Sequence, residues 1–219
     1  CWARIASSAA NWTMVGVAAN AANGVQSLIY FGTLANDPIG AYSEASDGTS
    51  ASAVSGATPA VGTWFHAAAT FVSSTDRNIY LNGTGTQNTT SKVVPTLSRI
   101  GIGCNGRPTL GSFHDGDLAE VAIWNVALTA AQIAVLAKGF SPLFVAPMSL
   151  VMYVPLINAI QDVRAAAVLT ATGTVASAHS RVIYTAPPFI QRWPVAPVGG
   201  RPLVNAGLVN RGLVNAGLV

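Results

Sequence analysis

Short runs of strand-type residues recur along the first 125 residues of the chain, and turn signals separate them. Asn-Gly, Asp-Gly and Pro lie between the runs, and Asn82-Gly83 follows one run directly, as a hairpin turn would. Many short strands at regular spacing are typical of a β-sandwich. The sequence therefore predicts an all-β fold with strands at 12–18, 27–34, 39–45, 64–72, 78–83, 99–104 and 117–125.

One helix is predicted after these strands. Thr129 is a suitable N-cap, Ile133 and Leu136 are three residues apart, and Gly139 follows as a stop signal. Beyond the helix, the sequence predicts further strands that return to the sandwich, at 149–156, 167–173 and 180–184.

The composition changes near residue 187. Five prolines at 187, 188, 194, 197 and 202 predict a tail over 187–219 after a domain over 1–186. The tail ends on LVNAGLVNRGLVNAGLV, a repeat of Leu-Val-Asn-x-Gly. Successive leucines would lie about 140° apart around a helix, so no apolar stripe forms. We predict an extended arm whose apolar residues need a partner surface: Leu203, Val204, Leu208, Val209, Leu213, Val214 and Leu218.

Charge is scarce, at 9% of residues, and the excess is positive. Residues 141–219 hold five arginines and Asp162 alone, but the arginines are scattered and no lysines cluster with them. This pattern disfavours nucleic-acid binding and favours arginines that pair with a partner surface.

Neither a membrane span nor a disulfide framework is predicted. The uncharged stretch 139–161 has the length of a membrane span, but Pro142, Pro147 and Pro155 would break a helix there. The chain has two cysteines, Cys1 and Cys104, so a single bridge between them stays open.

Three blocks of the sequence resemble a known family. WFHAAATF with IYLNG, then IGIG, then FHDGDLAEVAIWN with LTAAQI are similar to the strands of the laminin-G-like branch of the concanavalin A-like lectin/glucanase superfamily. The resemblance implies a jelly-roll sandwich of two antiparallel sheets. It also implies that the family's usual N-terminal strand would lie ahead of Cys1, outside this sequence, and that residues 149–184 complete the sheets.

The sequence offers one candidate ligand site and no catalytic motif. Retaining glucanases of this superfamily carry a Glu-x-Asp-x-x-Glu strand, and neither Glu44 nor Glu120 lies in such a motif, so we predict no enzymatic activity. His114, Asp115 and Asp117 form a local polar cluster. We predict a calcium or sugar site in which Asp115 and Asp117 supply carboxylate ligands, with a solvated turn as the alternative. Ala119 stands where the family often has Asp.

These features lead to two functional hypotheses. The first is a non-enzymatic structural protein, such as a phage virion decoration, fibre or surface protein, located on a virion or an extracellular surface. Its arm would contact neighbouring subunits of the same or another structural protein, and the chain would form a homo-oligomer. The alternative is a lectin-like surface or secreted module that binds glycans, with calcium as a candidate cofactor.

Overall fold

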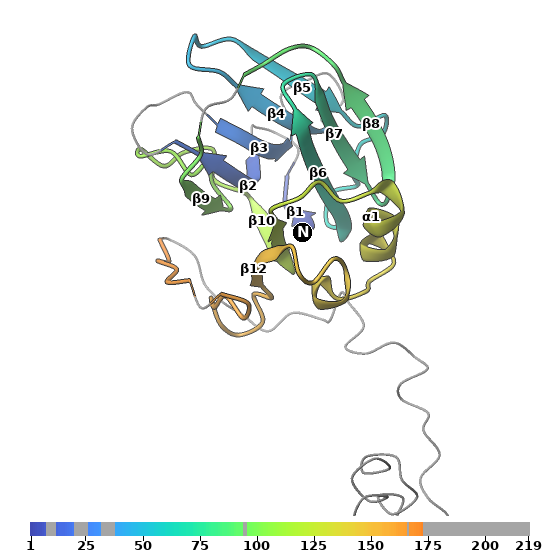
Figure 1. The fold of residues 1–219 in the computed structure, drawn as a ribbon. Coiled ribbons are helices and arrows are strands. Elements are labelled where there is room, and N and C mark those ends of the chain that lie inside the picture. Colours follow the sequence, from blue (N-terminus) through green and yellow to red (C-terminus); the bar gives the residue numbers. More distant parts are fainter. Residues whose placement is uncertain (8–11, 20–25, 32–37, 94–95, 166, 173–219) are drawn as a thin grey trace, which may run out of the picture. The chain divides into compact units, whose positions relative to one another are not determined.

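The computed structural model describes residues 1–7, 12–19, 26–31, 38–93, 96–165 and 167–172 (Figure 1). The predicted strand at 180–184, the domain boundary at residue 187 and the arm residues from Leu203 to Leu218 lie outside these residues. They stay predictions.

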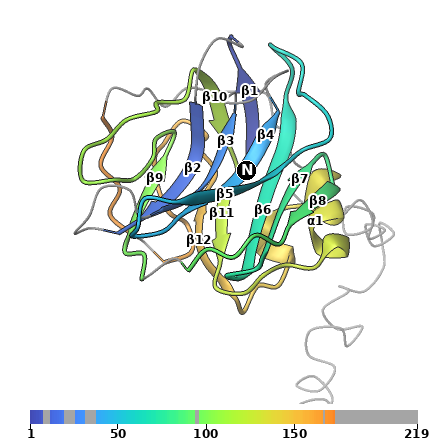
Figure 2. The same cartoon turned by 90° about the horizontal axis from the view of Figure 1, so that it is seen from above.

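Two five-stranded antiparallel sheets form the sandwich, which confirms the predicted jelly-roll class. The first sheet has the order β10 (Gly116–Ala119), β1 (Trp2–Ile5), β6 (Phe65–Ser73), β7 (Asp76–Leu81) and β8 (Thr84–Asn88). The second has the order β5 (Ser50–Val54), β4 (Ile39–Glu44), β3 (Gln26–Phe31), β2 (Trp12–Ala18) and β9 (Arg99–Ile102). Two further strands, β11 (Val121–Trp124) and β12 (Leu150–Val154), pair with each other (Figure 2).

The core lies between the two five-stranded sheets. Alternate residues of each strand point inward because successive side chains of a strand face opposite sides. Ile5 and Ile79 from the first sheet meet Met14, Ile39 and Ala41 from the second, and all five are fully buried. Burial of such side chains supplies about 1.5–3 kcal/mol each for the larger ones, which fixes the register of the strands.

Helix α1 (Ala130–Ala137) covers the outer face of β6, as the views in Figures 1 and 2 agree. Thr129 accepts a hydrogen bond from the backbone of Gln132, and the Gln132 side chain accepts one from the backbone of Thr129. This capping box confirms the predicted helix start. The buried side chains Ile133 and Leu136 anchor the helix, as the sequence predicts.

Two predictions about strands are wrong. The strand predicted over 117–125 is broken at Glu120, whose φ of 55° ends β10 before β11 begins. The described part of the strand predicted over 167–173 contains no strand. The Asp162 carboxylate accepts hydrogen bonds from four backbone N–H groups, among them those of Ala165 and Ala167. These bonds hold the chain in a turn, and Val168 beyond it is 95% exposed.

The two thiols are not paired. Cys1 and Cys104 are both free, so the bridge that the sequence left open is absent from the described residues.

Candidate functional site

The outer face of the second sheet carries a polar cluster at one end of β3 and β4. On β4, Ala41 and Ser43 alternate with Tyr42 and Glu44, so the latter two point away from the core. Gln26 of β3 lies directly opposite Glu44 in the strand register. The pairing of these two strands therefore places an amide beside a carboxylate.

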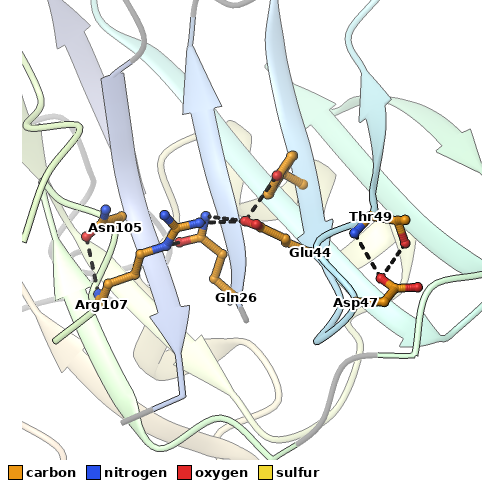
Figure 3. Close-up of polar contacts among 7 residues, drawn as sticks. Gln26, Glu44, Asp47, Thr49, Asn105 and Arg107 are labelled. Atoms are coloured by element: carbon orange, nitrogen blue, oxygen red, sulfur yellow. Dashed lines mark hydrogen bonds and ion pairs between the residues drawn. The ribbon is translucent and has the colours of Figure 1, made fainter. Parts of the chain in front are cut away.

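Arg107 completes this cluster, which Figure 3 shows in close-up. Its guanidinium donates to Glu44 Oε2 through Nη2 at 2.5 Å and to Gln26 Oε1 through Nε at 3.0 Å. Gln26 Nε2 and the Tyr42 hydroxyl also donate to Glu44 Oε2, at 3.2 and 3.1 Å. We call Gln26, Tyr42, Glu44 and Arg107 the outer-face cluster.

A loop after β9 delivers Arg107 to the sheet. Asn105 Oδ1 accepts hydrogen bonds from the backbone N–H groups of Arg107 and Gly111, both at 3.2 Å. The loop packs directly on two glycines. A Cβ on Gly101 would lie 2.5 Å from the nitrogen of Gly106, and one on Gly16 would lie 2.7 Å from the Asn105 carbonyl oxygen. Only glycine fits at these two strand positions, since any side chain would push the loop away.

The outer-face cluster is partly open to solvent. The side chains of Arg107 and Glu44 are 26% and 14% exposed, respectively. Burial raises the pKa of Tyr42, and the Glu44 carboxylate adds to this effect, so the hydroxyl keeps its proton at neutral pH. Gln26 is 5% exposed, so the cluster presents a guanidinium, a carboxylate and a neutral phenol at one place, with the amide buried behind them. Such a set can donate to and accept from the hydroxyl groups of a polar ligand.

The sequence-predicted site lies on the other sheet, at the start of β10. Asp117 pairs with Arg4, whose Nη2 is 2.6 Å from Oδ2, and both side chains are nearly half exposed. Asp115 Oδ2 accepts a hydrogen bond from the Ser7 hydroxyl at 2.8 Å. His114 is partly buried, and burial lowers its pKa although backbone hydrogen bonds at Asp117 and Arg4 and then the carboxylates of Asp115 and Asp117 oppose this.

This arrangement is a poor fit for a calcium ion. The Asp117 carboxylate already faces a cation, the Arg4 guanidinium, with which a metal would compete. Across the residues that the structure describes, no group of three or more His, Cys, Asp or Glu side chains is placed to hold a metal ion. The predicted calcium and sugar roles of His114, Asp115 and Asp117 stay predictions.

The two glutamates of the chain occupy different environments. Glu44 belongs to the outer-face cluster, whereas Glu120 is 3% exposed and accepts a hydrogen bond from the Tyr153 hydroxyl in the interior. Retaining glycosidases need two carboxyl groups about 5–5.5 Å apart, facing one substrate. A catalytic pair formed from Glu44 and Glu120 would require Glu120 to leave the core.

A comparison with known families agrees with this architecture. Residues 1–134 match the family model described as the concanavalin A-like lectin/glucanases superfamily. The chain belongs to this superfamily. Its name covers both binding proteins and hydrolases, so membership leaves both classes of activity open. A comparison with curated proteins gave no match.

The outer-face cluster was not predicted from the sequence of this superfamily member. Gln26 and Arg107 are 81 positions apart, and no local motif joins them. One sequence feature could have drawn attention to it. Only nineteen residues of the chain are charged, and Glu44 and Arg107 are two of them. In a separate observation, the described part of the chain contains no helix with the length and apolar character of a membrane span.

Proposed function

We propose that this chain is a non-catalytic binding module whose outer-face cluster recognises a carbohydrate. The observation that carries the proposal is the convergence of Gln26, Tyr42, Glu44 and Arg107 on one partly exposed patch. Planar carboxylate and guanidinium groups suit the paired hydroxyls of a sugar ring, because each offers two hydrogen bonds in a fixed plane, and the buried Gln26 amide holds both groups in place. The distinct environments of Glu44 and Glu120 support the absence of glycosidase activity.

Glycan-array binding of the full chain tests this proposal. Arg107→Gln should reduce binding to any glycan that the wild type retains by at least tenfold, since it removes a charge-assisted donor and releases Glu44 and Gln26. Lys92→Gln is the matched control, because Lys92 is also basic and its ammonium donates to the Thr49 hydroxyl outside the cluster. Circular dichroism verifies that each variant is folded. Equal binding by wild type and Arg107→Gln would overturn the proposal.

A calcium contribution is tested in the same assay. If Asp115 and Asp117 hold calcium, then EDTA and the double variant Asp115→Ala/Asp117→Ala should each abolish glycan binding, while Arg107→Gln acts independently. Binding that survives EDTA would assign glycan recognition to the outer-face cluster without a metal.

A second function, assembly of a larger structure, is favoured by the terminal repeat. Leu-Val pairs recur every five residues from Leu203 with few charges among them. Contiguous apolar residues of this kind mark interaction sites when no core of their own buries them. We propose that the arm contacts neighbouring subunits, and that the chain is a structural component of an assembly such as a phage virion or a cell surface. Deleting residues 187–219 should abolish self-association measured by sedimentation velocity; unchanged association would refute it.

A further inference from the structure

The ion pair between Glu44 and Arg107 uses one oxygen and one nitrogen of its two partners. Arg107 Nη2 lies 2.5 Å from Glu44 Oε2, whereas Arg107 Nε donates to Gln26 Oε1 instead of to the carboxylate. Arginine and a carboxylate often form two parallel hydrogen bonds, but this pair shares a single one. Glu44 Oε1 and Arg107 Nη1 therefore take no part in the contacts that build the outer-face cluster.

Three donors hold the other oxygen of Glu44 in place. Besides Arg107, the Gln26 amide and the Tyr42 hydroxyl both donate to Oε2. Gln26 is 5% exposed, and the strand register sets it opposite Glu44. Hydrogen bonds to a charged group are about twice as strong as neutral ones. The carboxylate is thus held in one orientation, with its negative charge beside the guanidinium.

The charges of the cluster and of the turn after it are balanced. The cluster holds one guanidinium and one carboxylate, those of Arg107 and Glu44. In the turn between β4 and β5, Asp47 Oδ1 accepts hydrogen bonds from the backbone and the hydroxyl of Thr49. The Lys92 ammonium donates to the same hydroxyl. An acidic and a basic group therefore meet in this turn as well.

Arg99 of β9 also belongs to the outer face of this sheet. It pairs with Ala18, and Ala18 pairs with Gln26, so two strand spacings, about 10 Å, separate the positions of Arg99 and Gln26. This exceeds the Debye length of about 8 Å at physiological ionic strength, so the charge of Arg99 is largely screened at the cluster. The cluster therefore offers an anionic ligand no net positive charge.

A sugar hydroxyl suits the two atoms that the cluster leaves over. It can donate to Glu44 Oε1 and accept from Arg107 Nη1, because a hydroxyl has both roles. An ionised carboxylate only accepts, so it would satisfy Nη1 but leave Oε1 without a donor and face Glu44 with the same charge. Like charges and unmatched polar groups are means by which binding sites reject a wrong partner. The chemistry of the pair thus favours a neutral sugar over an acidic one.

We propose that the outer-face cluster selects uncharged glycans and that Glu44 is the residue that excludes acidic ones. Glu44 does so in two ways, because it occupies Arg107 and it repels a ligand carboxylate. The inference rests on the carbohydrate function proposed above and names the class of glycan. Without the charge of Glu44, the Asn105 loop would still hold Arg107 at the sheet, and a guanidinium suits a carboxylate well. Loss of this one charge should therefore turn the preference of the site toward acidic glycans.

Glu44→Gln tests this role, because it removes the charge and keeps the length and one acceptor oxygen of the side chain. The probes are oligosaccharides of glucose, galactose and mannose, each beside its uronic acid counterpart, in which a carboxylate replaces the hydroxymethyl group of the ring. We expect the wild type to bind its best neutral probe at least tenfold more tightly than the uronic acid counterpart in titration calorimetry. In Glu44→Gln this ratio should fall at least tenfold.

Asp47→Asn is the matched control. It removes a negative charge three residues from Glu44 and keeps Oδ1 as the acceptor for Thr49, outside the cluster. Because exposed charges are screened by salt, the ratio of neutral to acidic binding should stay within about twofold of the wild-type value. Circular dichroism verifies that both variants are folded.

Ionic strength gives a readout that needs no variant. The affinity of the wild type for its best glycan should change less than about twofold between about 50 and 500 mM NaCl, since an uncharged ligand has no long-range attraction to be screened. A large loss of affinity over this range would show that an anion is bound and would overturn the inference.

The outcomes separate this inference from the carbohydrate function. Binding of acidic glycans by the wild type that is as tight as that of neutral ones, and is lost in Arg107→Gln, would retain carbohydrate recognition and refute the role of Glu44. An unchanged ratio in Glu44→Gln would refute it too. No binding of any glycan by the wild type would refute the carbohydrate function and this inference together.

Discussion

Asp162 joins the end of the described chain to β12 through hydrogen bonds. Its replacement should lower the free energy of unfolding by several kcal/mol. The side chain is 1% exposed, and its two oxygens accept hydrogen bonds from four backbone N–H groups at 2.9–3.2 Å. One donor, the N–H of Tyr153, belongs to a residue that is 4% exposed, so it would be left without a partner in the interior, at a cost of about 1–3 kcal/mol. The backbone N–H groups of Arg164, Ala165 and Ala167 belong to exposed residues. Water can replace the carboxylate as their acceptor, at a loss of about 0.5 kcal/mol for each hydrogen bond.

The sum predicts that Asp162→Ala lowers the free energy of unfolding by about 2.5–4.5 kcal/mol. Asp162→Asn keeps one acceptor oxygen for Tyr153 and Arg164 but turns an amide toward Ala165 and Ala167, so we expect about half that loss. Urea unfolding followed by circular dichroism measures both values. A loss below about 0.5 kcal/mol for Asp162→Ala, within the usual range of surface substitutions, would refute the reasoning.

Acid dependence gives the same prediction a second readout. Burial alone would raise the pKa of Asp162, but the four backbone hydrogen bonds outweigh it and lower the pKa from 3.8. A lowered native pKa means that the unfolded chain binds the proton first as pH falls. The contribution of Asp162 is therefore complete above about pH 5 and is lost as the pH falls through the lowered native pKa. The difference in stability between wild type and Asp162→Asn should shrink below pH 4, and a difference that grows there would contradict the assignment.

Further variants test the loop that carries Arg107, the start of α1 and the Arg4–Asp117 ion pair. Gly101→Ala places a Cβ against the loop that delivers Arg107, so it should destabilise the protein by more than 1 kcal/mol and weaken glycan binding, whereas Gly56→Ala, with open space around it, should do neither in the same assays. Thr129→Ala removes the capping box of α1, and urea unfolding should record a loss of about 1 kcal/mol. Arg4→Gln breaks an exposed ion pair and should change the free energy of unfolding by less than about 1 kcal/mol. A larger change would indicate that the contact of the Arg4 guanidinium with the Trp64 ring also stabilises the fold.

The strands and the helix could be predicted because their signals are local. The Asn82-Gly83 turn, the Thr129 cap and the alternation of buried residues within strands each depend on a few neighbouring positions. The break at Glu120 escaped prediction because the flanking residues all favour a strand, and only tertiary contacts hold a non-glycine residue at positive φ. Residues 167–172 have strand-type composition, but the hydrogen bond from the Ala167 N–H to the Asp162 carboxylate holds the start of this segment in a turn.

The outer-face cluster needed information that a single sequence does not carry. It depends on the register that sets Gln26 opposite Glu44 and on the path of a loop that brings Arg107 from 63 positions beyond Glu44. By contrast, the polar cluster of His114, Asp115 and Asp117 was visible because its members are adjacent. The structure directs two of these side chains to separate partners, Ser7 for Asp115 and Arg4 for Asp117. Proximity in sequence therefore predicted the location of polar side chains but not their convergence.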